Sequence, residues 1–218
     1  MSLSAQMLGV SNWHFPITSL GFGERVGLWV QGCSIGCRGC MSLDTWAPSK
    51  APLDIDHLIE DMQPALARAD GLTISGGEPF DQAEAMLTFL SKVKPLVSGD
   101  ILLFTGYDHD EIPHQAKSAL GSLDVLVSGP FVQEKAARLP LRGSENQEIW
   151  LRSQLAEERY GAILTAPLTA PAIDVVAEQD GFWLAGIPGP GDLDALSKTL
   201  ATRGIKLKTS AGRMGARK

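Results

Sequence analysis

Hydrophobic residues in the first part of the chain alternate between short continuous runs and segments with helical spacing. Four of the runs are short enough to be buried strands: Val26–Gln31, Leu72–Ser75, Ile101–Phe104 and Val125–Val127. Between the runs, apolar residues recur every three or four positions, which is typical of one face of a helix. The expected helices lie at residues 58–66, Ala83–Val93 and Glu111–Ala119, and Pro64 is expected to bend or interrupt the first of them.

Strands that alternate with helices pair in parallel through right-handed crossovers, so this pattern predicts an α/β fold. The chain has too few strand–helix units for a closed eight-fold barrel, and we therefore expect an open, partial (β/α) barrel. Functional sites in such folds lie at the carboxyl ends of the strands. Four segments follow expected strands and should gather on one rim: residues 33–40, Gly76–Glu78, Thr105–Tyr107 and Ser128–Phe131.

The pattern changes after residue 171. Two apolar runs, Ile173–Ala177 and Phe182–Ala185, flank Gln179-Asp180-Gly181 and predict a hairpin. A helix with Asp192 as its N-cap is expected to follow. These patterns predict three parts: a core at residues 1–151, a linker rich in proline and threonine at 152–171, and a small C-terminal α+β appendage at 172–218 that ends in a basic tail.

The composition argues against some classes of partner. The chain has 218 residues, 44% hydrophobic and 20% charged, which is ordinary for one globular catalytic domain. A net charge of −6 argues against a nucleic-acid partner, because phosphate binding needs clustered positive charge. No apolar run reaches the roughly 20 residues of a membrane span, and no leader pattern begins the chain, so we expect a cytoplasmic protein without a membrane partner.

Three cysteines are the entire cysteine content of the chain, and Cys33, Cys37 and Cys40 fall within eight residues. A C-x3-C-x2-C loop can hold one iron–sulfur cube through three thiolates, which leaves one iron open for chemistry. Thiolates are the ligands that such clusters prefer, and the intervening glycines allow the loop to fold tightly. Three other interpretations stay open: a zinc site completed by His14, a disulfide, or unligated core cysteines.

A second motif, Gly76-Gly77-Glu78-Pro79, follows the strand expected at Leu72–Ser75. Glycines allow the backbone to approach a ligand closely, and a carboxylate at this position can accept hydrogen bonds from an ammonium group. Alone the motif is a weak signal, because a Glu78 side chain that caps the next helix explains it equally well. Its place after the cysteine triad favours a cofactor-binding turn.

The cysteine spacing resembles that of radical S-adenosylmethionine (SAM) enzymes. The run at residues 23–32 before Cys33, and Thr45-Trp46 behind the loop, are similar to the activating-enzyme branch of that superfamily, in particular to activators of anaerobic ribonucleotide reductase. Most of the superfamily has an aromatic residue before the third cysteine, whereas this chain has Gly39, as is common in that branch. The resemblance implies a partial barrel of the radical SAM type.

The resemblance also implies cofactors and site residues. Cys33, Cys37 and Cys40 would hold a [4Fe-4S] cluster, and the Gly76–Pro79 turn would hold the amino group of SAM. Two further sets are implied: Thr105 and Tyr107 on the cofactor side, and Arg142, Asn146 and Gln147 on the partner or substrate side. The latter three stand in a polar stretch without periodicity, which predicts a loop, and loops on a rim often carry recognition residues.

The implied function is reductive cleavage of SAM to a 5′-deoxyadenosyl radical that activates a glycyl-radical enzyme subunit, with a flavodoxin- or ferredoxin-like electron donor. Two alternatives stay open. One is radical modification of a peptide or small molecule. The other is a non-catalytic iron–sulfur module for electron transfer or sensing, against which the Gly76–Glu78 turn argues.

Overall fold

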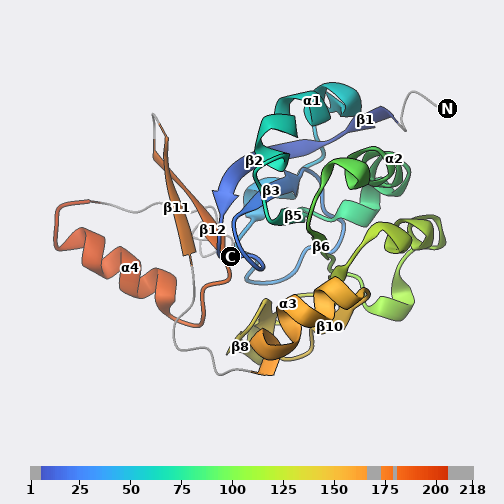
Figure 1. The fold of residues 1–218 in the computed structure, drawn as a ribbon. Helices are drawn as coiled ribbons and strands as arrows, with labels where there is room; N and C mark the ends of the chain where they lie inside the picture. Colours follow the sequence, from blue (N-terminus) through green and yellow to red (C-terminus); the bar gives the residue numbers. More distant parts are fainter. Residues whose placement is uncertain (1–5, 166–172, 179–180, 206–218) are drawn as a thin grey trace.

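The computed structural model describes residues 6–165, 173–178 and 181–205 (Figure 1). Its centre is a six-stranded sheet with the order β10-β7-β6-β5-β3-β2. The strands are β2 (Val10–Ile17), β3 (Arg25–Val30), β5 (Gly71–Gly76), β6 (Asp100–Phe104), β7 (Val125–Ser128) and β10 (Glu148–Leu151). β3, β5, β6 and β7 pair in parallel, and β2 and β10 are antiparallel edges. The mixed α/β fold and the four expected strands are confirmed.

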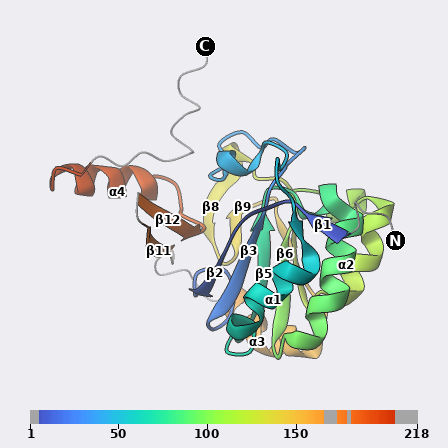
Figure 2. The same cartoon turned by 90° about the horizontal axis from the view of Figure 1, so that it is seen from above.

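Helices α1 (Ile55–Leu66) and α2 (Ala83–Val93) cover one face of this sheet (Figure 2). Along β6, Ile101 and Leu103 face this main core, whereas Leu102 belongs to a second cluster on the opposite face. That alternation is the period of two expected for a strand buried on both sides. The parallel strands are therefore enclosed, and their functional loops can only be at the strand ends.

Two of the expected helices differ in detail from the prediction. α1 runs through Pro64 without interruption, because the proline stands in the last turn and removes only one hydrogen bond while Leu58, Ile59 and Met62 stay buried. The segment expected as a helix at Glu111–Ala119 instead forms two 3-10 helices, η5 (His109–Glu111) and η6 (His114–Ser122). η6 packs against α2 through the small buried residues Ala116 and Ala119. Over so short a segment, apolar residues three positions apart fit a 3-10 helix as well as an α-helix.

The stretch expected to be a linker is partly helical. Residues Gln154–Thr165 form α3, and the side chains of Ala156 and Tyr160 are completely buried. They pack against residues such as Leu102 and Val125 on the second face of the sheet. Because only these two residues of α3 are buried, the helix carries almost no apolar stripe in the sequence. The rest of the expected linker, residues 166–172, lies outside the described residues.

The expected hairpin is present as β11 (Ile173–Glu178) and β12 (Gly181–Gly186), followed by α4 (Asp192–Ala201). Turn residues 179–180 and the basic tail from 206 lie outside the described residues. Asp192 is the first residue of α4 rather than its N-cap, because Gly191 takes that place with a φ of 82°. Trp183 of β12 packs edge-on against Trp29 of β3, with ring centroids 4.4 Å apart.

Four short strands complete the described structure. They pair as two small antiparallel ribbons, β1 (Met7–Leu8) with β4 (Leu53–Asp54), and β8 (Ala136–Leu139) with β9 (Arg142–Ser144). Across the parts of the chain that the structure describes, no helix is both long and apolar enough to cross a membrane.

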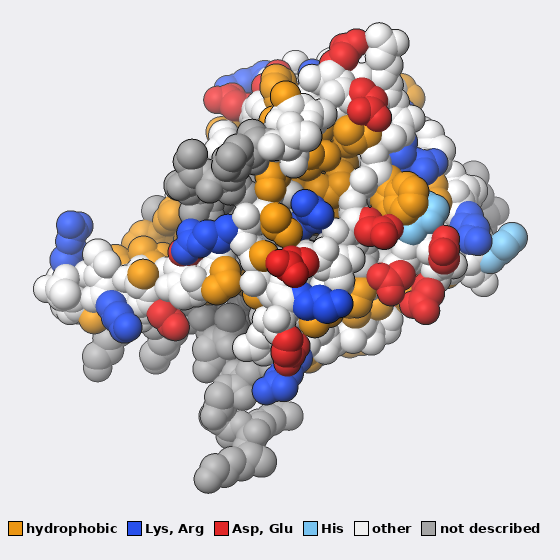
Figure 3. All heavy atoms as spheres, turned by 90° about the horizontal axis from the view of Figure 1, so that it is seen from below, with side chains coloured by type: hydrophobic (Ala, Val, Ile, Leu, Met, Phe, Trp, Pro, Cys, Tyr) orange, Lys and Arg blue, Asp and Glu red, His pale blue; other side chains and the backbone are white. Residues whose placement is uncertain are grey.

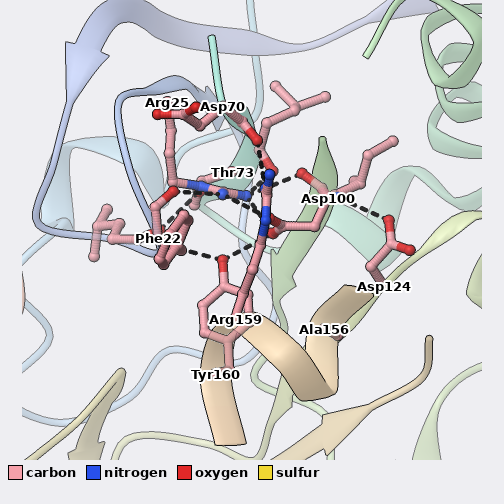
Figure 4. A network of polar contacts seen from close by, with 12 residues as sticks. Phe22, Arg25, Asp70, Thr73, Asp100, Asp124, Ala156, Arg159 and Tyr160 are labelled. Carbon is pink, nitrogen blue, oxygen red and sulfur yellow. Dashed lines mark hydrogen bonds and ion pairs between the residues drawn. The ribbon is translucent and has the colours of Figure 1, made fainter. Parts of the chain in front are cut away.

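A buried ionic network joins the amino ends of the parallel strands (Figure 4). Arg25 at the start of β3 and Asp100 at the start of β6 form a fully buried ion pair with an Nη2–Oδ2 distance of 2.8 Å. Arg159 and Tyr160 of α3 bond to the same carboxylate, with Nη1–Oδ1 and Oη–Oδ2 distances of 2.6 and 2.8 Å. Thr73 of β5 accepts from Arg25 Nε at 2.7 Å. The network thus holds α3 against β3, β5 and β6 at the amino ends of these strands.

Candidate iron–sulfur cluster site

The loops that follow the parallel strands line one cavity of about 560 Å³. This volume is typical of a site for a small molecule or cofactor. All four predicted segments contribute to the lining: the cysteine loop after β3, Gly76–Glu78 after β5, Thr105–Gly106 after β6 and Gly129 after β7. The predicted gathering of these segments on one rim is confirmed. Figure 3 views the face opposite α1 and α2 and shows hydrophobic side chains gathered in a hollow beside the C-terminal appendage.

The cysteine loop is held in place by hydrogen bonds between its first residues and the segment behind it. The Gly32 N–H donates to the Thr45 carbonyl at 2.7 Å, and the Cys33 N–H donates to the Trp46 carbonyl at 3.1 Å. Gln31 Nε2 donates to the Ala47 carbonyl at 2.6 Å. The Thr45-Trp46 pair noted in the sequence therefore closes the loop behind the cysteines, where it fixes the position of Cys33.

The three cysteines are free and half-buried, and all three line the cavity. Burial raises the pKa of the Cys33 and Cys37 thiols, so they resist ionisation while no metal is bound. The Ser42 N–H donates to Cys40 Sγ at 3.3 Å, which fixes the position of that sulfur. Metal coordination deprotonates a thiol outright, which overcomes the cost that burial adds to ionisation.

These residues fit an iron–sulfur cube. Within the described ranges, no three or more His, Cys, Asp or Glu side chains form a ligand set for one metal ion. In a cube each thiolate binds a different iron, so the three sulfurs need only face one cavity. His14, the residue needed for the zinc alternative, lies on β2 beside Trp183, with ring centroids 5.7 Å apart, and is not among the residues of the cavity lining. The donor set therefore favours the cluster over zinc.

The glycine turn after β5 packs directly on the cysteine loop. A Cβ atom built on Gly77 would lie 2.1 Å from the Gly32 carbonyl oxygen, and Gly76 has a φ of 106°. The Glu78 N–H donates to the same Gly32 carbonyl at 2.8 Å. Side chains at positions 76 and 77 would separate the two loops, so the two glycines allow the turn and the cysteine loop to share one cavity.

Glu78 lines the cavity and is almost completely buried. Its Oε1 accepts from the Phe80 N–H at 2.9 Å and from Thr105 Oγ1 at 2.8 Å, and its Oε2 accepts from the Gly106 N–H at 2.7 Å. The cap alternative is thus correct in part, because Glu78 caps the 3-10 helix η3 (Pro79–Gln82). The same carboxylate also ties the loops after β5 and β6 together, and Oε2 retains an acceptor site for a ligand.

We expect Glu78 to make the cluster-free protein less stable as the pH rises from 4.5 to about 7. Burial raises the folded-state pKa of this carboxyl from 4.5 to about 7, so the folded protein keeps a proton that the unfolded chain has released. The free energy of unfolding should therefore fall across this interval, by about 3 kcal/mol at roughly 1.4 kcal/mol per pH unit. Urea unfolding at closely spaced pH values measures the slope.

Glu78→Gln should flatten that slope, because glutamine does not titrate. Asp174 supplies the matched control. Burial opposes its ionisation, but hydrogen bonds from Ser19 and Thr18 outweigh that effect and lower its pKa below 3.8. Its stabilising contribution is lost only as the pH falls through that lower pKa, so Asp174→Asn should leave the slope between 4.5 and 7 unchanged. An unchanged slope in Glu78→Gln would contradict the prediction.

Asp81 is a site residue that the sequence analysis missed. Its Oδ2 accepts from the Ser34 N–H at 2.6 Å, and its Oδ1 accepts from Ser34 Oγ at 2.7 Å and from Tyr107 Oη at 3.0 Å. Asp81 therefore links the residue after Cys33 to the loops after β5 and β6. A carboxylate two residues beyond the Gly76–Pro79 motif was the only available signal, and nothing in the sequence indicated its partner.

Some of the predicted cofactor residues line the cavity and others do not. Gly76, Gly77, Glu78 and Thr105 line the cavity, whereas Pro79 and Tyr107 are not among the described lining residues. Pro79 is buried at the start of η3, and Tyr107 donates its hydroxyl hydrogen to Asp81. These two therefore support neighbouring residues rather than face the cavity.

The predicted partner-side residues are engaged inside the chain. Arg142 lies in strand β9 rather than in a loop, and its Nη1 donates to the Gln147 carbonyl at 3.4 Å. Gln147 lines the cavity and bonds to Gly129 and Gly143, while Asn146 Nδ2 donates to the Pro130 carbonyl at 2.8 Å. Within the described chain, Arg142 Nε and Asn146 Oδ1 are buried without a hydrogen-bond partner.

Comparison with known proteins agrees with this geometry. A family described as the 4Fe-4S single cluster domain matches residues 19–150, so the chain belongs to that family. Its curated relatives include the anaerobic ribonucleoside-triphosphate reductase-activating protein of Haemophilus influenzae, 38% identical over 137 residues, which cover 59% of this chain and 88% of the relative. The predicted [4Fe-4S] cofactor and the resemblance to the activating-enzyme branch are thereby confirmed.

Proteins of the same name in two other bacteria are also similar. The Vibrio cholerae protein is 37% identical over 149 residues, covering 63% of this chain and 96% of the relative. The Escherichia coli protein is 31% identical over 150 residues, covering 63% of this chain and 97% of the relative. The crystal structure of QueE from Escherichia coli superimposes with a TM-score of 0.42 at 15% identity over 56% of this chain and 72% of that chain, a likeness too small to carry an argument.

Proposed function

We propose that this chain cleaves SAM reductively at a three-cysteine [4Fe-4S] cluster and activates a glycyl-radical enzyme of the anaerobic ribonucleotide reductase type. The observation that carries the proposal is the shared cavity, in which Cys33, Cys37 and Cys40 face the Gly76–Glu78 turn. The mixed sheet with its parallel centre is then the open partial barrel of a radical SAM protein. The β11–β12 hairpin and α4 form its C-terminal appendage.

When held by Cys33, Cys37 and Cys40, a [4Fe-4S] cluster would supply one electron to the sulfonium of SAM, with methionine and a 5′-deoxyadenosyl radical as the products. A low-potential donor of the flavodoxin or ferredoxin class would provide that electron. The radical would serve to remove a hydrogen atom from the Cα of a glycine, with 5′-deoxyadenosine and a glycyl radical as the products. The protein contributes orientation and exclusion of water.

Different residues of the chain bind the cluster, position its loop and bind SAM. The three cysteines hold the cluster, and Asp81 positions their loop through Ser34. The free acceptor site of Glu78 Oε2 and the close approach allowed by Gly76 and Gly77 suit the ammonium group of SAM. Thr105 keeps the Glu78 carboxylate oriented through its 2.8 Å hydrogen bond.

Arg142, Asn146 and Gln147 act on the substrate side in this proposal by holding the loop after β7 at the rim. Gln147 Nε2 donates to the Gly129 carbonyl at 3.0 Å, and Asn146 Nδ2 donates to the Pro130 carbonyl at 2.8 Å. Their effect on a partner would therefore be indirect, through the position of Gly129–Phe131.

The experiment is anaerobic assay of the cluster-loaded protein with dithionite and SAM, followed by addition of the anaerobic ribonucleoside-triphosphate reductase of Haemophilus influenzae. We expect 5′-deoxyadenosine and methionine in equal amounts, and a doublet glycyl-radical signal in electron paramagnetic resonance after the reductase is added. Loaded protein that makes no 5′-deoxyadenosine would favour an electron-transfer or sensing module. Cleavage of SAM without a radical on the reductase would favour modification of a peptide or small molecule.

A further inference from the structure

The C-terminal segment forms one wall of the cluster cavity. The lining includes a continuous stretch from Leu184 in β12 to Gly191 before α4, and also Leu193 and Asp194. We call residues 184–194 the C-terminal wall. The family match ends at residue 150, so this wall lies outside it. The sequence pattern of these residues predicted no role in the site.

Asp174 anchors the wall to the core. Its carboxylate accepts four hydrogen bonds of 2.7–2.9 Å, from the N–H and hydroxyl groups of Thr18 and Ser19. Ser19 Oγ also lies 3.1 Å from the Ala185 carbonyl, so the same residue touches both strands of the hairpin. A carboxylate with four donors is well satisfied, which holds the hairpin at a defined place beside the cavity.

Two more contacts position the wall. Arg138 of β8 forms an ion pair with Asp192 at the start of α4. Ala185 and Ile187 pack in the apolar cluster that includes Trp29 and Phe104 of the sheet. The wall therefore has polar contacts near both ends and packs against the sheet between them, as expected for a segment with a fixed position in the site.

The charge of the lining limits what the cavity can accept. Among its described residues there is no lysine, arginine or histidine, and its carboxylates are Glu78 and Asp194. The wall itself is apolar apart from its backbone, Asp192 and Asp194. An anionic metabolite would lose its hydration there without gaining a cation, which is costly. A neutral polypeptide segment loses far less. The wall also leaves open space at Gly191, where a Cβ built on the backbone would have no atom within 4 Å.

We propose that the C-terminal wall determines substrate specificity, by admitting a neutral glycine-containing polypeptide segment and excluding anionic metabolites from the radical. This inference rests on the proposed function for its chemistry. The contact between wall and substrate is separate from that chemistry. It can therefore be measured without turnover.

The first test uses a capped, uncharged octapeptide whose single glycine carries deuterium at both Cα positions. Cluster-loaded protein, dithionite and SAM should yield 5′-deoxyadenosine that contains one deuterium atom. Leu184→Asp and Ile187→Asp add a charge to the wall and should lower the deuterated fraction of the 5′-deoxyadenosine at least about tenfold. Val175→Asp is the matched control, because Val175 is the cross-strand partner of Leu184, is 59% exposed and is not among the lining residues.

The second test needs no variant and no turnover. Amide hydrogen exchange of unreduced, cluster-loaded protein with SAM should slow at residues 184–194 by about threefold or more when the octapeptide is added, and should not change with guanosine triphosphate. Unprotected wall amides, or a deuterated fraction equal to wild type in both wall variants, would overturn the inference. Protection by guanosine triphosphate would overturn the exclusion of anions. Protection by the peptide without any 5′-deoxyadenosine would instead show that the proposed chemistry is wrong and the wall assignment right.

Discussion

Replacement of Cys37 by alanine is expected to abolish both cluster binding and cleavage of SAM. Cys37 stands at the centre of the C-x3-C-x2-C loop, and its thiol faces the cavity together with those of Cys33 and Cys40. Two thiolates leave two irons of a cube without protein ligands, so anaerobic reconstitution should fall from about four irons per chain to near zero. Iron analysis and the formation of 5′-deoxyadenosine measure the two losses.

Arg38→Ala provides the control in the same loop. The Arg38 side chain is 80% exposed and lies 3.7 Å from Glu134, a contact too exposed to matter for the fold. This variant should therefore bind iron as wild type does. A Cys37→Ala protein that still takes up about four irons would contradict the assignment of this loop as the cluster site.

Asp100→Ala is expected to lower the free energy of unfolding by about 3–5 kcal/mol, because it leaves a buried guanidinium without its counter-ion. Arg25 and Asp100 are completely buried, and the Asp100 carboxylate also accepts from Arg159 and Tyr160. The substitution would therefore release α3 from the sheet as well as expose the charge of Arg25 to an apolar interior. Urea unfolding of the cluster-free, reduced protein measures the change.

A surface ion pair serves as the comparison. Lys92 Nζ lies 2.6 Å from Asp56 Oδ1, a shorter distance than in the buried pair, but both side chains are substantially exposed to solvent. Lys92→Ala should consequently cost no more than about 1 kcal/mol. Equal losses for Asp100→Ala and Lys92→Ala would show that the Arg25 network does not stabilise the sheet. The network lies at the amino ends of the strands, whereas the cysteine loop follows the carboxyl end of β3. The contacts of the cysteine loop in the Asp100→Ala protein should therefore depend on how much of the sheet remains folded.

The elements that the sequence predicted correctly are those whose signal is local. β5, β6 and β7 are short apolar runs, and α2 begins and ends where its helical spacing does, at Ala83 and Val93. The cysteine spacing needs only eight residues to indicate a cluster. The rim could also be predicted, since parallel strands bring their carboxyl ends to one edge. α3 could not, because its two buried residues leave no periodic pattern.

The chemistry of the site can therefore be recognised in the sequence: three thiols in one loop, a glycine turn with a carboxylate, and the strands that carry them. Which distant groups meet depends on the tertiary structure. Ser34 and Asp81 are separated by 47 positions, Arg25 and Asp100 by 75, and Ser19 and Asp174 by 155. Hydrogen bonds of this kind depend on how strands and helices pack, and packing leaves no periodic trace near either partner. The C-terminal wall became part of the site for the same physical reason.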